Sequence, residues 1–132
     1  MKNALTLDTY LRTFVGFPFD WGTANCCHMA FGWVRIVEPH TDADLSIPES
    51  KTGCLREIAE HGSLQNLISV KLKRAAIAPT MAQVGDLVML SGPDETAIGI
   101  CNGRRAACRT EDGVSFADME NAICAWPLVG AD

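Results

Sequence analysis

The stretch that most constrains this chain is 19–27, Phe-Asp-Trp-Gly-Thr-Ala-Asn-Cys-Cys, in which a turn-like entry leads to two adjacent thiols. From Cys26 onward the apolar residues recur at the spacing of one helix face, at Met29, Ala30, Trp33, Val34 and Val37. The pattern predicts a helix that begins at Cys26, buries one face and ends near Val37, before Pro39. Asn25 is suited to cap its first turn.

Cys26 is therefore a candidate nucleophile. The unpaired N–H groups in the first turn of a helix stabilise an anion, which favours the thiolate over the thiol. The alternative interpretation is structural, because a free cysteine is frequently a small, buried apolar side chain. The thiol by itself leaves both interpretations open.

The rest of the N-terminal half also predicts helices. The first is predicted over 5–15, where four apolar or aromatic residues share one face and Gly16 supplies a stop. A polar, proline-bearing loop at 40–50 follows the cysteine helix, and its acidic residues and Pro48 predict that it lies at the surface. Two further helical patterns cover 51–62, which ends on a glycine, and 63–72.

The C-terminal half changes to the pattern of strands. After an irregular connection, the predicted strands cover 85–90, 96–101, 104–109, 114–116 and 123–128. Pro127 places the last strand at an edge of the sheet, because proline has no N–H to donate. Helices first and antiparallel strands second predict an α+β fold, with N-terminal helices packed on a C-terminal antiparallel sheet in a single domain, 1–132.

Charge and composition exclude several function classes. The net charge is −5, and the one group of basic residues, Arg104, Arg105 and Arg109, is interpreted as a solvated hairpin face rather than a nucleic-acid site. No apolar run is long enough to span a membrane, and no secretory leader is visible. The six cysteines show no C-x-x-C spacing, so we expect reduced thiols and neither a metal nor another cofactor.

With these pieces in place, the chain resembles the NlpC-type branch of the papain-like cysteine peptidases. The matching motifs are Trp21-Gly22, Asn25-Cys26-Cys27, Gly85-Asp86-Leu87-Val88 and Ala97-Ile98-Gly99-Ile100, in family order over nearly the whole chain. The resemblance implies a papain-like arrangement, in which the cysteine helix docks against the strand that contains Ala97.

A closer resemblance is to small NlpC-like proteins encoded among the tail genes of long-tailed bacteriophages. Further motifs carry it: Gly53-Cys54, Asp112-Gly113-Val114 and Ala125-Trp126. It implies a virion protein at the tail tip, made in the host cytoplasm, whose partners are other tail proteins such as hub, distal tail or tip components. Peptidoglycan is a further candidate partner.

The chain differs from the family at the position of the catalytic base. The family's catalytic histidine corresponds to Ala97, and the next strand has only Ala106 and Ala107 where a third polar residue is usual. Thiolate attack needs a base that later protonates the leaving amine, and alanine can do neither. Of the three histidines, His28 lies too close to Cys26 on one helix, while His40 and His61 lie in the helical half.

Two functions from different classes follow. The sequence favours a catalytically degenerate peptidase fold used as a structural or assembly protein of the tail tip. The alternative is an active cysteine peptidase or amidase that cleaves peptidoglycan stem peptides during phage entry, with His40 or His61 recruited as the base. A host-encoded binding module and a redox protein that uses Cys26 and Cys27 also stay open.

Overall fold

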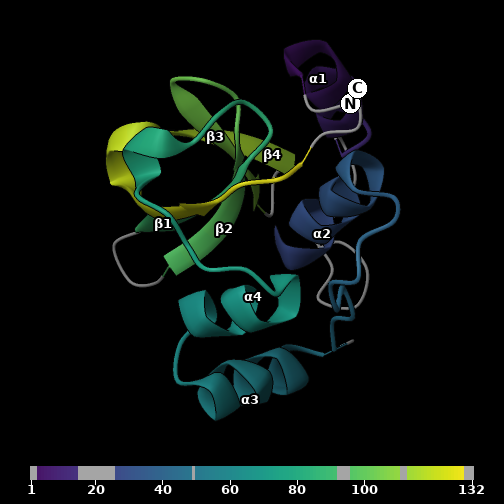
Figure 1. Cartoon of the computed structure of the whole chain (residues 1–132), viewed down its shortest axis with the longest axis vertical. Coiled ribbons are helices and arrows are strands. Elements are labelled where there is room, and N and C mark those ends of the chain that lie inside the picture. The colour runs from purple at the N-terminus through teal and green to yellow at the C-terminus, as the bar shows by residue number, and fades with distance from the viewer. Residues whose placement is uncertain (1–2, 15–25, 49, 92–95, 111–112, 130–132) are drawn as a thin grey trace.

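A computed structural model of the chain describes residues 3–14, 26–48, 50–91, 96–110 and 113–129, except for the side chains of Cys26 and Thr110. Within these ranges, four helices precede a five-stranded sheet (Figure 1). The helices are α1 (Ala4–Arg12), α2 (Cys26–Val37), α3 (Lys51–His61) and α4 (Leu64–Leu72). The strands are β1 (Leu87–Ser91), β2 (Thr96–Cys101), β3 (Arg105–Thr110), β4 (Gly113–Asp118) and β5 (Ala122–Trp126), with short 3₁₀ turns η1 (Pro79–Met81) and η2 (Met119–Asn121).

The sheet is antiparallel, with strand order β4-β3-β2-β1-β5. The predicted α+β fold class is therefore confirmed, and β5 is an edge strand as predicted from Pro127. The outer side of β5 is partly covered, because the backbone of Ile77 both donates to and accepts from Ala125, with N···O distances of 2.7 and 2.9 Å.

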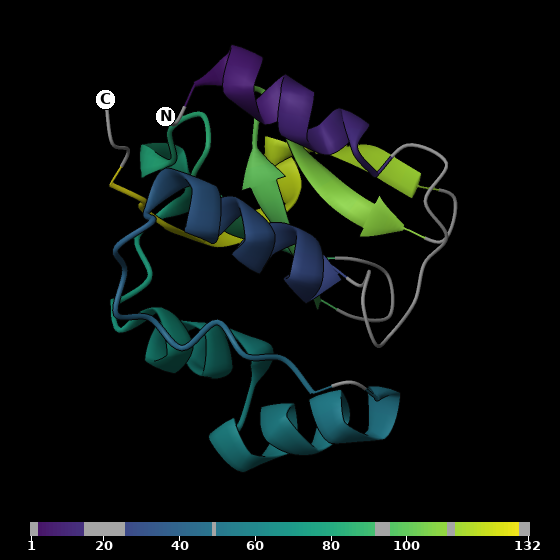
Figure 2. The ribbon, with the colours of Figure 1, turned by 90° about the vertical axis from the view of Figure 1, so that its right-hand side faces the viewer.

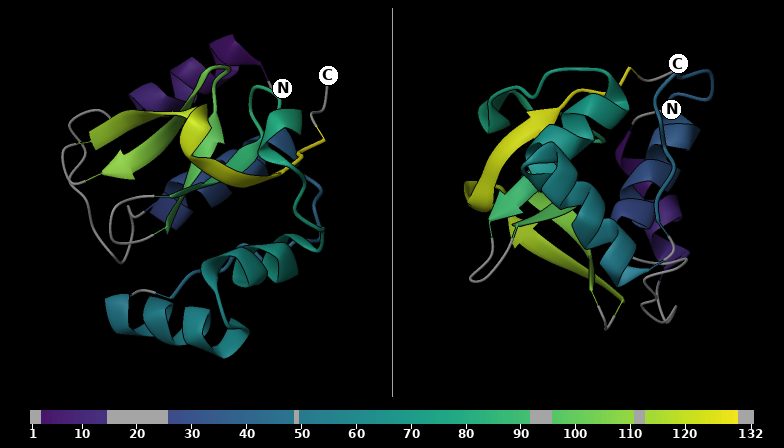
Figure 3. Two further views of the ribbon diagram at one scale, coloured as in Figure 1. Left: turned by 90° about the vertical axis from the view of Figure 1, so that its left-hand side faces the viewer. Right: turned by 90° about the horizontal axis from the view of Figure 1, so that it is seen from below.

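Helices α1 and α2 lie along one face of the sheet, and α3 and α4 project below it (Figure 2). The main core forms between α1, α2 and this face, and its sheet residues include Met89, Ile98, Ile100 and Ala107. The opposite face has a smaller core made of Val88, Leu90, Cys101, Ala106 and Ala125, packed against residues of the connection after α4 and of η2. Figure 3 shows both layers from the side and from below.

Helices α1 and α2 approach closely because Gly32 has no side chain. The Tyr10 hydroxyl donates to the carbonyl oxygen of Met29 at 2.6 Å. A Cβ atom on Gly32 would overlap that hydroxyl oxygen. A glycine inside a helix is unfavourable for the helix alone, so its place here follows from the contact with α1.

Helix α3 is the least buried helix, with no buried residue, and an ion pair holds it to α4. The Lys71 ammonium, whose side chain is 8% exposed, lies 2.6 Å from a Glu57 carboxylate oxygen. It also donates to the carbonyl oxygen of Ser46 at 2.7 Å. Ser50 and Ser63 cap α3 and α4 through their hydroxyls, and Gly62, with φ +86°, ends α3 as predicted.

Three expectations from the sequence are wrong. Helix α1 ends at Arg12 rather than at residue 15, where the N–H groups of Thr13 and Phe14 donate three residues back, to the carbonyls of Tyr10 and Leu11, as in a 3₁₀ turn. Phe14 still packs edge-on against Tyr10. The predicted stop, Gly16, lies outside the described residues. The loop at 40–50 is not wholly external, since Leu45 is buried. Arg109 is not part of a solvated face but is only 5% exposed.

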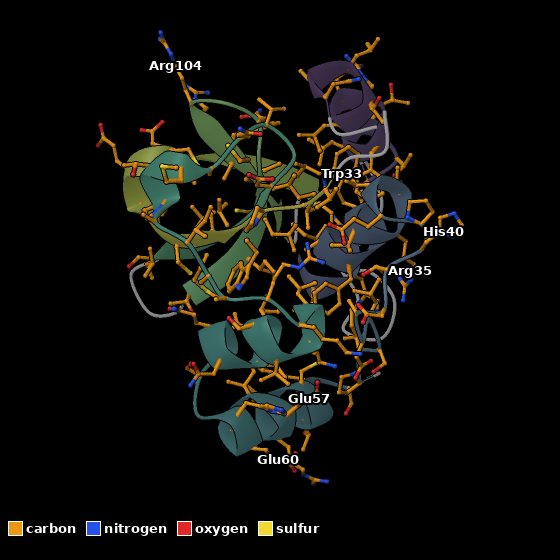
Figure 4. All side chains as sticks on the ribbon, viewed as in Figure 1. Trp33, Arg35, His40, Glu57, Glu60 and Arg104 are labelled. Atoms are coloured by element: carbon orange, nitrogen blue, oxygen red, sulfur yellow. The ribbon has the colours of Figure 1, made fainter. Side chains whose placement is uncertain are left out.

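Arg109 is buried because its neighbours compensate the charge locally. One guanidinium nitrogen donates to the carbonyl oxygen of Gly113 at 2.8 Å, and the guanidinium lies 5.6 Å from the ring centroid of Phe14. A hydrogen-bonded guanidinium over an aromatic face tolerates burial better than an isolated charge would. Arg104, by contrast, extends from the tip of the β2–β3 hairpin, away from the body of the domain (Figure 4).

Candidate functional site

The candidate site is the N-terminal end of α2. The helix begins at Cys26 and ends at Val37, as the apolar spacing predicted. Cys26 therefore has the first-turn position, where backbone N–H groups lack helical partners. The side chain of Cys26, the predicted cap Asn25 and the Trp21-Gly22 motif lie outside the described part of the structure.

A buried hydrogen bond fixes α2 relative to the sheet. The indole Nε1 of Trp33 donates to the carbonyl oxygen of Gly85 at 2.8 Å, and Trp33 lies between α2 and the sheet (Figure 4). Gly85 has φ +91°, a conformation that favours glycine, and its N–H donates to the Cys101 carbonyl at 2.7 Å. The Gly-Asp motif thus positions the cysteine helix as well as opening β1.

Asp86 is structural in this arrangement. Its residue is 1% exposed, and its carboxylate accepts hydrogen bonds from the backbone N–H groups of Gln83 at 2.8 Å and Leu128 at 3.0 Å. The carboxylate therefore closes the turn before β1 and holds the segment after β5. A carboxylate occupied in this way is not a base for Cys26.

Strand β2 packs against α2, as the papain-like arrangement requires. In Figures 1 and 2, the N-terminal end of α2 and the start of β2 lie at the same end of the domain. Ala97 is the second residue of this strand and pairs with Leu90 of β1.

Strand alternation determines what faces α2. Ile98 belongs to the core that contains α2, whereas Leu90, the partner of Ala97, belongs to the core on the other face. Ala97 therefore lies on the face away from α2, and Thr96 and Ile98 lie on the face toward it. None of the three has a group that accepts a proton near neutral pH.

The next strand offers no polar side chain at the predicted third position. Ala106 and Ala107 are both fully buried, and Ala107 faces α2 opposite Ile100. The polar residues of β3 on this face are Arg105 and Arg109, which always carry a positive charge and cannot act as bases. Strand β2 and the described part of β3 therefore contribute no base and no group to orient one.

The three histidines lie in the helical half. His28 is half-buried on α2. His40 is exposed and follows the C-terminal end of α2 (Figure 4), so it is separated from Cys26 by a helix about 18 Å long at 1.5 Å per residue. His61 is the last residue of α3, and its Nδ1 lies 2.9 Å from the carbonyl oxygen of Glu57, so that nitrogen donates to its own helix.

A small pocket of about 30 Å³ lies between α2, α3 and α4. Cys27 and Cys54 line it together with the Lys71–Glu57 pair and apolar side chains. This volume holds about one water molecule, which is far too small for a peptide. Sequence reasoning missed the pocket, although Lys71, four residues after Leu67 on the apolar face of α4, was a usable signal.

The described cysteines, Cys27, Cys54, Cys101, Cys108 and Cys124, are thiols outside any disulfide, as predicted for those five. Burial raises the pKa of the Cys101 and Cys124 thiols above the usual range. The described ranges contain no group of three or more histidine, cysteine or acidic side chains that could hold a metal ion. Among the helices in these ranges, none has both the length and the hydropathy needed to cross a bilayer.

The fold and the sequence were compared with those of known proteins. A solved structure, the NlpC/p60 domain of the peptidoglycan hydrolase SagA, matches with a TM-score of 0.56 and 14% sequence identity over 96% of this chain and 99% of that one. At this identity the likeness shows an NlpC-like fold and not an activity. No curated protein matches the sequence. Residues 2–128 match the family model of a domain of unknown function, DUF6950, and the chain belongs to that family.

Proposed function

We propose that this chain is a catalytically silent NlpC-like protein that acts as a structural or assembly component of a bacteriophage tail tip. The observation that supports the lack of catalysis is the set of residues at the start of β2. Whichever of the residues Thr96, Ala97 and Ile98 corresponds to the family histidine, its side chain cannot take the proton of Cys26.

The chemical consequence is large. In a cysteine peptidase the imidazole generates the thiolate and later protonates the leaving amine. A helix start can lower the pKa of a thiol, but it donates no proton to the amine. General acid–base catalysis contributes about a hundred- to ten-thousand-fold to the rate, and no group on β2 or on the described part of β3 replaces it.

The tail role is supported by the sequence motifs alone. The order Trp21-Gly22, Cys26-Cys27, Gly85-Asp86 and Ala125-Trp126 resembles the small NlpC-like tail proteins. On this proposal the partners are neighbouring hub, distal tail or tip proteins. The site of action is the virion tail tip, and the protein is made in the host cytoplasm.

A second candidate is a cysteine peptidase or amidase that acts on peptidoglycan stem peptides. Cys26 at a helix start in an NlpC-like fold favours it, and the similar solved domain comes from a peptidoglycan hydrolase. It needs a base from elsewhere, with His61 and His40 as the residues to test. The position of His61 at the C-terminal end of α3 argues against it, and so does the position of His40 beyond the C-terminal end of α2.

The experiment compares wild type with Cys26→Ala on purified peptidoglycan, beside an active NlpC/p60 domain as the positive control. The proposal expects no released stem-peptide fragments from either form. Hydrolysis by wild type that disappears in Cys26→Ala would establish the second candidate. The tail role is tested by mass spectrometry of purified tails and by gene deletion, and it fails if the tails lack the protein and assemble normally without it.

A further inference from the structure

The two edges of the sheet differ. The outer side of β5 is bonded in both directions to Ile77, and Pro127 follows the strand. The other edge is β4, and within the described ranges no strand pairs with its outer side. Natural edge strands are usually blunted by lysine, proline or a bulge. β4 has none of these and presents Phe116, which is 50% exposed.

The ladder between β3 and β4 shows which backbone groups of β4 point outward. The N–H of Met119 donates to the carbonyl of Arg104, in the same register that pairs Ala106 with Ala117. Hydrogen-bonded pairs alternate with non-bonded pairs along an antiparallel ladder. Ser115 and Ala117 therefore direct their backbone groups at β3. The residues between them and on either side, Val114, Phe116 and Asp118, direct theirs outward.

We propose that this edge pairs with itself, so that β4 of a second copy docks antiparallel to it about a two-fold axis at Phe116. In this register the outward residues meet only each other: Phe116 meets Phe116 of the second copy, and Val114 meets Asp118. Each pair exchanges two backbone hydrogen bonds, and no outward group between 114 and 118 is left unmatched. A two-fold contact of this kind closes on itself and does not propagate into fibres.

The charges fit the same register. Asp118 is the charged outward residue of β4, and it lies 3.7 Å from Arg105 on the neighbouring strand. In the dimer Asp118 stands opposite Val114 of the second copy, so like charges do not face each other across the axis. Behind that valine lies Arg109, its partner in the β3–β4 register. Each row of side chains across the four strands therefore runs from Arg109 to Val114 of one copy and then to Asp118 and Arg105 of the second copy. Its order is basic, apolar, acidic, basic.

The proposed contact between the two β4 strands is small, so the dimer should be weak. A ladder of five residues on each side buries far less than the roughly 1,200–2,000 Å² of a stable interface. The two Phe116 rings supply most of the apolar burial, as directly opposed aromatic side chains in a sheet do. We therefore expect a weak, concentration-dependent dimer rather than an obligate one.

Two measurements test the edge. Sedimentation velocity from low micromolar to submillimolar protein should show a reversible monomer–dimer equilibrium. Phe116→Lys should weaken dimerisation at least tenfold, because it places two ammonium groups at the axis. Leu55→Lys is the matched control, since Leu55 is 53% exposed but lies on α3, and it should leave the equilibrium unchanged.

Hydrogen exchange on wild type gives a signature that does not depend on any variant. The amides of Phe116 and Asp118 should exchange more slowly as concentration rises, while those of Ser115 and Ala117 should not change. A protein that is monomeric throughout the range would overturn the proposal. A dimer that Leu55→Lys disrupts and Phe116→Lys does not would also overturn it. So would exchange that slows equally at the amides of Ser115, Phe116, Ala117 and Asp118.

Discussion

The hydroxyl of Tyr10 occupies the space that a side chain at Gly32 would fill. A Cβ atom added to Gly32 would overlap that oxygen and would lie 3.5 Å from the ring carbon that bears it. The contact joins α1, which precedes the cysteine motif, to the helix that begins with Cys26. The position of the candidate site relative to α1 therefore depends on two residues outside the motif.

Gly32→Ala should destabilise the protein despite alanine's better helix propensity. Overpacking of this kind costs about 1–3 kcal/mol, against a propensity gain of about 1 kcal/mol. In a Tyr10→Phe background the clash disappears, so the same Gly32→Ala change should be neutral or stabilising. Urea unfolding of the four proteins in a double-mutant cycle measures this, and additive effects would contradict the close approach.

The ion pair between Glu38 and Arg74 predicts how the free energy of unfolding changes as the pH falls. Burial of Glu38 opposes ionisation, but hydrogen bonds from Arg74, at 2.7 and 2.8 Å, and from the Val129 N–H outweigh it, so the Glu38 pKa is lowered from 4.5. A lowered folded-state pKa gives stability that is complete above the unfolded-state pKa and is lost as pH falls through the folded value.

Wild type should therefore lose stability steadily below about pH 4.5, the ordinary glutamate value. Glu38→Gln should be less stable than wild type at pH 7, and the difference should shrink on acidification. Glu60→Gln on the exposed side of α3 is the control (Figure 4). Urea unfolding from pH 7 down to pH 3 checks this, and a difference that stays constant would show that Glu38 does not contribute through its charge.

Thiol reactivity should follow burial. Alkylation proceeds through the thiolate, and burial raises the pKa of Cys101 and Cys124, so both should react slowly with iodoacetamide in the native protein. The half-buried Cys54 should react sooner. Peptide mapping over a time course at pH 8 measures the order, which should vanish in denaturant. Rapid native labelling of Cys101 would contradict the burial of its side chain in the smaller core.

Ala97→His should not restore hydrolysis. The residue pairs with Leu90, so an imidazole there would enter the face of the sheet away from α2. The peptidoglycan assay with the active NlpC/p60 control measures this. Activity in Ala97→His that is lost on adding Cys26→Ala would show instead that position 97 reaches the thiol, and that a single substitution silenced the site.

Much of the fold could be predicted from local patterns. The 3.6-residue spacing after Cys26 gave the bounds of α2, and the run Thr96–Cys101 gave those of β2. Gly62 and Ser63 marked the junction of α3 and α4 because caps and stops act within one turn. Pro127 indicated the edge strand. These features depend on neighbours in the chain, so the sequence carries them directly.

The sequence by itself determined that the start of β2 carries no base, because none of Thr96, Ala97 and Ile98 can accept a proton near neutral pH, wherever the strand is placed. Only the tertiary structure decided that Arg109 is buried and that Lys71 pairs with Glu57 inside the α3–α4 contact. It also decided that Ala97 lies on the face away from α2. The burial of a side chain, its ion-pair partner and the sheet face on which it lies depend on residues far apart in the chain. Packing and strand register bring those residues together, and local spacing does not determine either.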